Sequence, residues 1–140
     1  MGQLTGKVAI ITGAGQGVGR GIAAAMFCGN DPMPIETTSE EYLRSAVQTN
    51  IFGLLYFMQA CFPYLKKGRG RVINFATGAG IEGWSYLFSY AATKEAIRGM
   101  TRVAAREWGS HGITVNVIAP MANSPSMQTA AASCWCDAST

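Results

Sequence analysis

The sequence is poor in charged residues and has no long run of charged or apolar residues. Charged residues make up 14% of its 140 residues, against about 25% in an average soluble domain. Because no run of about five like charges occurs, we expect no nucleic-acid partner. No stretch reaches the roughly 18 apolar residues of a membrane span, and Thr5, Gly6 and Lys7 stand where a signal peptide would be apolar. We therefore expect a cytoplasmic protein that makes no membrane contact.

Metal-ligating residues are also scarce. His111 is the single histidine, and Cys134 and Cys136 form an isolated pair that falls short of a four-ligand zinc site. We expect no metal. Without an export signal, reduced thiols are expected rather than disulfides at the four cysteines, which are Cys28, Cys61, Cys134 and Cys136.

Apolar residues are abundant enough for a core. They make up 49% of the chain, and a chain of this length buries about 68% of its unfolded surface. We expect one domain over residues 1–120. Residues 121–140 are rich in Ala, Ser and Thr without a clear period, which predicts an irregular carboxyl-terminal tail.

Three short, β-branched apolar runs predict strands at Lys7–Thr12, Arg71–Phe75 and Ile113–Ile118. The first is expected to be buried on both faces of a parallel sheet. The glycine-punctuated segment Thr77–Gly83 is expected to be a loop.

Three other segments predict helices. Arg20–Phe27 is rich in alanine, an apolar stripe follows about Ser39–Lys66, and small residues line one face of about Ser89–Trp108. Thr38 with Glu41 fits a capping box at the start of the second helix. Alternating strands and helices predict an α/β fold with a parallel sheet.

A glycine-rich loop, Thr12–Gly19, lies between the first strand and the first helix. Free backbone N–H groups and the helix dipole converge at such a loop, and glycine lets a phosphate approach closely. This pattern favours a nucleotide phosphate site, and a simple tight turn is the alternative.

Three polar positions could support proton chemistry. Tyr90 and Lys94 are four residues apart on one helix face, where a nearby cation favours the tyrosine phenolate. Thr77, just after the second strand, offers a hydroxyl to a substrate oxygen. Asn50 borders an apolar helix stripe, where an amide needs partners. Taken singly, the alternatives are a surface contact for the Tyr90–Lys94 pair and a polar residue at the edge of the stripe for Asn50.

These features, in this order along residues 4 to about 120, resemble the short-chain dehydrogenase/reductase family. The matching positions are Thr12, Gly13, Gly17 and Gly19 of the cofactor loop, Asn50 of the helix, Tyr90 and Lys94 of the Tyr-x-x-x-Lys motif, and Asn116, Ile118 and Pro120 at the last strand.

The resemblance implies NAD(P)-dependent hydride transfer to or from a small carbonyl or alcohol substrate. Tyr90 would be the acid/base, Lys94 would assist it and hold the nicotinamide ribose, Thr77 would orient the carbonyl, and Asn50 would hold a relay water. NAD is slightly favoured over NADP because Gln16 is not basic. The implied cofactor site comprises Gly13, Gly15, Gln16, Gly17, Val18, Gly19, Tyr90, Lys94 and Pro120.

The resemblance also implies an internal deletion. Family members have further strands where Phe27 here leads within a short segment to Thr38, so the second to fourth strands are missing and the carboxyl terminus is shortened. We expect a Rossmann-like three-layer fold with a reduced, mostly parallel sheet. In the family the two long helices pack between subunits, which predicts a homo-oligomer, either a dimer or a tetramer. The alternative function is a catalytically silent member that acts as a subunit partner through these helices.

Overall fold

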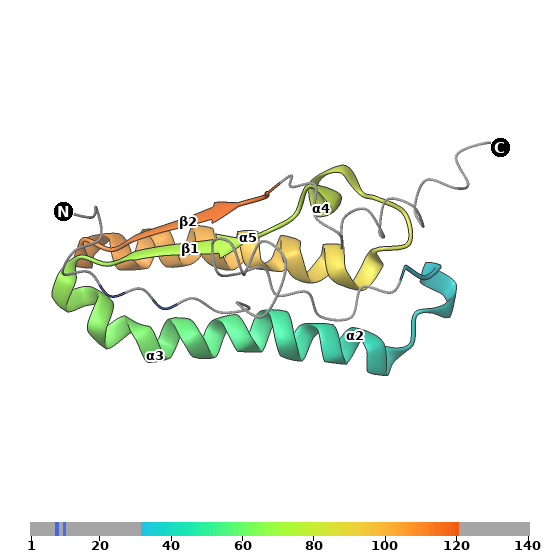
Figure 1. Ribbon diagram of the computed structural model, residues 1–140, viewed down its shortest axis with the longest axis horizontal. Helices are drawn as coiled ribbons and strands as arrows, with labels where there is room; N and C mark the ends of the chain where they lie inside the picture. Colours follow the sequence, from blue (N-terminus) through green and yellow to red (C-terminus); the bar gives the residue numbers. More distant parts are fainter. Residues whose placement is uncertain (1–7, 9, 11–31, 121–140) are drawn as a thin grey trace.

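The computed structural model describes Val8, Ile10 and residues 32–120. In this part of the chain, two parallel strands pack against two long helical segments (Figure 1). The elements are η1 (Ile35–Thr37), α2 (Glu40–Val47), η2 (Gln48–Phe52), α3 (Gly53–Gly68), β1 (Arg71–Phe75), α4 (Gly78–Glu82), α5 (Phe88–Trp108), η3 (Gly109–His111) and β2 (Thr114–Ile118).

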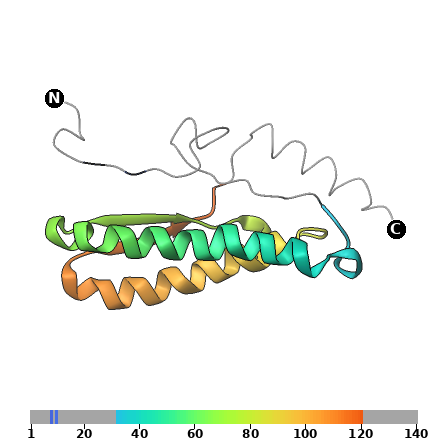
Figure 2. The same cartoon turned by 90° about the horizontal axis from the view of Figure 1, so that it is seen from below.

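The α2, η2 and α3 segments follow one another without a break and form one long helical rod (Figure 2). Ser39, not Thr38, caps the rod, because the Ser39 hydroxyl accepts the Tyr42 N–H at 3.1 Å. The Thr38 hydroxyl instead donates to Pro34 O at 3.1 Å, at the end of the preceding 3-10 turn. The expected capping box from Thr38 to Glu41 is therefore wrong, because the helix is capped one residue later, by Ser39.

The sheet is parallel, with Arg71 opposite Thr114 and Phe75 opposite Ile118. The predicted second and third strands and the helix before the third strand are confirmed to within one residue. Asn74 and Val115 are buried beneath the helices, whereas Ile73 and Ile118 are 56% and 47% exposed on the opposite face.

One apolar cluster joins the rod, α5 and the inner sheet face. Its buried members are Met58, Ala104, Ile113 and Val115, and partly buried residues such as Phe62 pack around them. The α/β class and the parallel sheet are thus confirmed. The described residues supply the sheet and the helical layer on one of its faces, and among them no helix has the length and apolar character needed to cross a membrane.

Two local expectations are wrong. The expected loop at Thr77–Gly83 contains the short helix α4, because Thr77 caps it and Gly83 ends it with a positive φ of 73°. In the expected buried strand Lys7–Thr12, the two described residues, Val8 and Ile10, lie outside any strand and are 94% and 69% exposed. A buried strand needs neighbours in the sheet and on its faces, and the described sheet ends at β1.

Candidate active site

The predicted site residues of the described chain gather around the carboxyl ends of β1 and β2. The two strands end in register at Phe75 and Ile118, and the Ala76 N–H donates to Ile118 O at 2.8 Å. Thr77 and Pro120 each lie two residues beyond these strand ends. The carboxyl edge of a parallel sheet is where open α/β folds bind ligands, so the topology brings both residues to a suitable edge.

Tyr90 and Lys94 lie one turn apart on α5. The Lys94 Nζ is 5.6 Å from the centroid of the Tyr90 ring and donates a hydrogen bond to Phe75 O at 3.0 Å. Lys94 is 5% exposed, and desolvation by burial lowers its pKa from 10.5 to about 8. At neutral pH the buried side chain is still mostly protonated, so a positive charge faces the tyrosine ring.

Lys94 also has the capacity to hold a ribose. An ammonium group has three N–H donors, and the hydrogen bond to Phe75 O uses one of them. The other two can donate to the hydroxyl groups of a nicotinamide ribose, because a hydroxyl oxygen accepts hydrogen bonds. The donor capacity of Lys94 therefore fits the cofactor that the sequence suggests.

Asn50 lies in the π-helical turn η2 and is 5% exposed. Its Nδ2 donates to Thr93 Oγ1 at 3.0 Å, and Thr93 Oγ1 donates to Tyr90 O at 2.9 Å. A π-helical turn inside an α-helix often marks a functional position. The turn aims Asn50 at the α5 segment that carries Tyr90 and Lys94.

The sequence pattern did not reveal the role of Thr93. It is 1% exposed and lies inside the Tyr90–Lys94 motif, where it links the asparagine of one helix to the backbone of the other. Its place inside the motif was the available signal. Which neighbour its hydroxyl would meet depends on the packing of the two helices.

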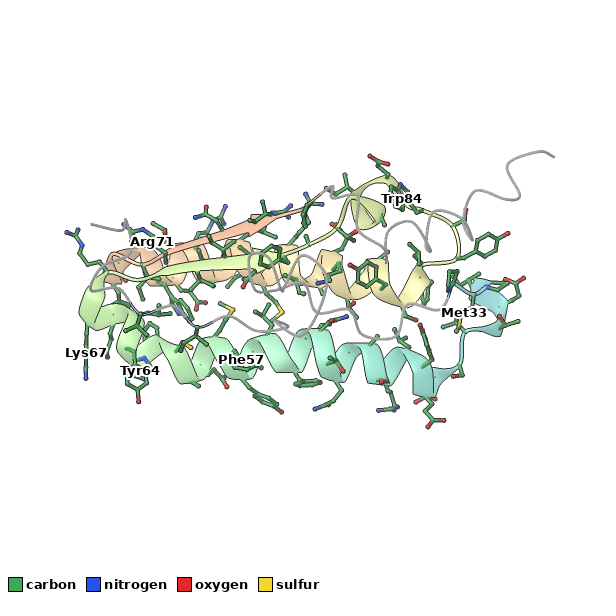
Figure 3. The ribbon with its side chains drawn as sticks, in the orientation of Figure 1. Met33, Phe57, Tyr64, Lys67, Arg71 and Trp84 are labelled. Carbon is green, nitrogen blue, oxygen red and sulfur yellow. The ribbon has the colours of Figure 1, made fainter. Side chains whose placement is uncertain are left out.

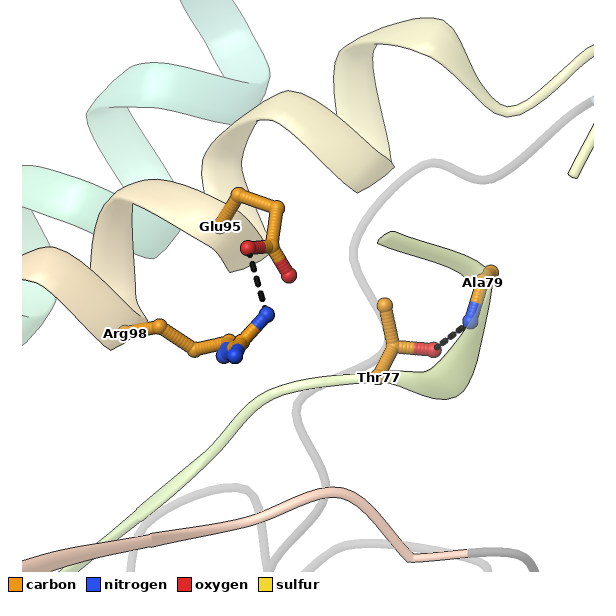
Figure 4. A network of polar contacts seen from close by, with 4 residues as sticks. All are labelled: Thr77, Ala79, Glu95 and Arg98. Atoms are coloured by element: carbon orange, nitrogen blue, oxygen red, sulfur yellow. Dashed lines mark hydrogen bonds and ion pairs between the residues drawn. The ribbon is translucent and has the colours of Figure 1, made fainter. Parts of the chain in front are cut away.

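Thr77 caps the short helix that follows β1. Its Oγ1 accepts the Ala79 N–H at 3.3 Å and caps α4 (Figure 4). This contact uses a lone pair and not the hydroxyl proton, so Thr77 can still donate to a substrate carbonyl.

Close packing holds α4 against α5 just beyond Thr77. A Cβ added to Gly80 would lie 2.9 Å from Glu95 Oε1 and 3.3 Å from Ala91 O. The other Glu95 oxygen, Oε2, forms an ion pair with Arg98 at 2.7 Å (Figure 4). The absence of a side chain at Gly80 thus lets the segment that follows Thr77 approach the helix that carries Tyr90.

A buried polar contact fixes β1 against α5. Asn74 Nδ2 donates to Thr101 Oγ1 at 2.9 Å, and Thr101 Oγ1 donates to Ile97 O at 2.7 Å. Asn74 and Thr101 are 5% and 3% exposed. The sequence pattern places Asn74 only in a strand, and the structure adds that its side chain is hydrogen-bonded to α5.

The predicted phosphate loop, Thr12–Gly19, lies outside the described residues. Its expected cofactor contacts remain predictions, namely those of Gly13, Gly15, Gln16, Gly17, Val18 and Gly19. Over the part of the chain that the structure describes, no group of three His, Cys, Asp or Glu side chains could hold a metal ion.

Residues 24–133 match the short chain dehydrogenase family. The chain is 44% identical over 90 residues to a 12alpha-hydroxysteroid dehydrogenase of a Clostridium species, covering 64% of this chain and 35% of that protein. It is 41% identical over 101 residues to a diacetyl reductase, (S)-acetoin forming, of Staphylococcus aureus, covering 70% of this chain and 39% of the relative.

The fold is also similar to solved structures. The crystal structure of the Cj0485 dehydrogenase superposes with a TM-score of 0.66 at 31% identity, over 75% of this chain and 41% of that one. The structure of ElxO with NADP bound has a TM-score of 0.66 at 27% identity, over 76% and 44%. The chain therefore spans less than half the length of these relatives.

Proposed function

The chain belongs to the short-chain dehydrogenase family, and from that premise we propose that it is an NAD(P)-dependent oxidoreductase. The proposed reaction transfers a hydride between a nicotinamide and the carbonyl or alcohol carbon of a small substrate. The observation that carries the proposal is the joint placement of Tyr90, Lys94 and Asn50, with the Lys94 ammonium 5.6 Å from the Tyr90 ring centroid. We propose residues 1–120 as the catalytic domain and 121–140 as its tail.

The chain's own residues would manage the proton and the substrate oxygen. When bound, the nicotinamide supplies or accepts the hydride. Tyr90 exchanges a proton with the substrate oxygen, and the buried charge of Lys94 favours its phenolate. Thr77 donates a hydrogen bond to the same oxygen, so that the carbonyl is held for attack. Asn50, held by Thr93, positions a water that passes the proton onward.

The proposed cofactor is NAD or NADP, with a slight preference for NAD because Gln16 is not basic. The glycine loop would hold the diphosphate, and Lys94 and Pro120 would lie beside the nicotinamide end. The relatives' names suggest the first substrates to assay, which are diacetyl and a 12α-hydroxysteroid.

Calorimetric titration with NADH and NADPH tests this function. We expect saturable binding of at least one of them, and we expect Gly17→Val to abolish it because a valine side chain fills the path by which the diphosphate approaches the loop. Circular dichroism establishes that both proteins are folded. The absence of binding by a folded wild-type protein contradicts the function, and unchanged binding by the variant contradicts the loop assignment.

A second function, subunit interaction, is supported by the outer side of the helical rod. Phe57 and Tyr64 point away from the sheet and α5 (Figure 3), and they are 49% and 75% exposed. Phe52 and Tyr56, on the same rod, are 40% and 56% exposed. Few charged residues accompany them, and exposed aromatic side chains are enriched at protein interfaces.

Sedimentation velocity tests the second function. We expect the wild-type chain to form a dimer or tetramer, and we expect the double variant Phe57→Glu and Tyr64→Glu to sediment as a monomer, because it buries two carboxylates in the interface. Lys67→Glu, at the exposed end of the same rod, serves as the charge-changing control. A wild-type chain that is a monomer at all concentrations, alone and mixed with a full-length relative, contradicts subunit interaction.

A further inference from the structure

The start of α5 has neither a side-chain cap nor an acidic residue in its first turn. Leu87 precedes the helix and makes no side-chain hydrogen bond to it. By contrast, α2 is capped by Ser39 and carries Glu40 and Glu41 in its first turn. The first N–H groups of a helix lack partners inside it, and the dipole of a helix of 21 residues makes that end positive. The start of α5 therefore favours a negative charge.

The turn that leads into α5 brings further N–H groups to the same place. Tyr86 has a positive φ of 64°, which a bulky residue rarely adopts, and Leu87 follows at φ −111° and ψ 30°. Successive N–H groups in a turn of this kind converge as a nest for an anion. Within residues 32–120, the backbone N–H groups of Tyr86–Ser89 have no hydrogen-bond partner. The carbonyl groups of Tyr86 and Leu87 are already used, because they accept the Met33 and Ala91 N–H groups at 3.0 and 2.8 Å.

A buried hydroxyl group at this place also lacks a partner. Ser89, in the first turn of α5, is 4% exposed, and its Oγ forms no hydrogen bond. Nearly all buried polar groups in native proteins are hydrogen-bonded, so an unpaired one calls for an explanation. A ligand bound beside Ser89 would supply the missing partner.

A small cavity lies against this turn. It is lined by Met33, Tyr42 and the continuous segment Tyr86–Tyr90. Met33 lies at the end of the molecule where both α2 and α5 begin (Figures 1 and 3). The cavity volume is about 10 Å³, the space of one water-sized sphere, so it admits a single atom-sized ligand and excludes a polyatomic anion such as phosphate.

The charges around the cavity permit an anion. None of the described residues that line it carries a carboxylate. The acidic side chains of the neighbouring elements, which are Glu36, Glu40 and Glu41, are exposed, so solvent screens them. Glu40 is also paired with Arg44 at 2.6 Å.

We propose that the Tyr86–Ser89 turn and the cavity beside it bind a halide ion, with chloride as the available species. The backbone N–H groups of the turn and the Ser89 hydroxyl supply donors to the ion. A halide only accepts hydrogen bonds, whereas a water must also donate, and the two carbonyl groups of the turn already accept other N–H groups. The site uses none of the groups assigned to proton transfer, so it stands whether or not the chain turns over a substrate.

Chloride NMR on the full chain tests binding in solution. We expect a saturable broadening of the chloride signal at constant ionic strength, and we expect bromide to reverse it by competition. Ser89→Ala removes one donor to a charged ligand, so it should weaken chloride binding about 10-fold or more. Ser110→Ala is the matched control and should bind as the wild type does. Its hydroxyl is exposed beyond the opposite end of α5 and donates to Glu107 O at 3.1 Å.

Bromide located in crystals of the wild-type protein tests the position. Anomalous diffraction should show bromide within hydrogen-bonding distance of Ser89. A water in the cavity without an anomalous signal, or a chloride signal that does not saturate, overturns the proposal. Bromide at Ser89 without saturable binding in solution means an adventitious ion only, and overturns it too. So does equal binding by Ser89→Ala and Ser110→Ala. If Ser89→Ala fails to fold, the two wild-type measurements decide.

Discussion

Replacing Tyr90 with phenylalanine is expected to lower kcat for carbonyl reduction by about 10² to 10⁴-fold, the usual contribution of a positioned acid or base. The substitution keeps the ring next to Lys94, whose Nζ is 5.6 Å from its centroid, and removes only the hydroxyl group. Binding of NADH or NADPH should change little, because the ring and the ammonium remain. Steady-state kinetics with diacetyl and calorimetry on the same preparation separate the two effects.

Tyr64→Phe is the matched control. Tyr64 is 75% exposed on the outer side of α3, far along the rod from the Asn50 turn, so the loss of its hydroxyl should leave kcat unchanged. If the wild-type chain reduces diacetyl and Tyr90→Phe does so at the same rate, the acid/base assignment is wrong. A loss of cofactor binding in Tyr90→Phe would mean that the tyrosine acts in binding rather than in proton transfer.

Replacing Lys94 with methionine is expected to change how the stability of the fold depends on pH. Burial lowers the pKa of Lys94 from 10.5 to about 8, so below pH 8 the folded protein bears the full cost of a desolvated ammonium. Between pH 8 and 10.5 the folded state releases the proton while the unfolded state still holds it. The free energy of unfolding of the wild type should therefore rise with pH across this interval.

The expected size of this effect is about 3 kcal/mol, since one pKa unit corresponds to about 1.4 kcal/mol. We expect urea unfolding at a series of pH values to show the wild type gaining this amount relative to Lys94→Met between pH 8 and 10.5. The lost hydrogen bond to Phe75 O adds an offset that does not vary with pH, because a neutral amine still donates.

Lys67→Met, which removes an exposed ammonium near the end of α3, is the control. Its free energy of unfolding should depend on pH in the same way as that of the wild type. The comparison of variants cancels the other groups that titrate at high pH. Parallel curves for the wild type and Lys94→Met would show that Lys94 is not desolvated in solution.

Local patterns predicted the elements of the described chain well. Arg71–Phe75 was predicted to the residue, and α5 and β2 to within one residue at their starts, because β-branched runs and helical periodicity act over a few neighbouring positions. One of the errors lies where two local options compete. Thr38 and Ser39 are both good caps, and the choice depended on the turn at Pro34, which uses the Thr38 hydroxyl.

The sequence predicted which residues form the candidate site, from their types and their order along the chain, but not the contacts between them. Sequence analysis singled out Asn50, Thr77, Tyr90 and Lys94, because their types and their order along the chain resemble a family pattern. It did not show that Asn50 reaches the α5 motif through Thr93, because that contact joins residues 43 positions apart.

The sequence by itself thus determined the two long helical segments, the two described strands and the family of this protein, since each depends on short-range patterns or ordered motifs. Only the tertiary structure decided that Lys94 is buried on Phe75 O and that Asn74 is bound by Thr101. Burial and hydrogen-bond partners depend on which distant segments pack together. That choice is made by the whole hydrophobic core and cannot be assigned to any single stretch of the chain.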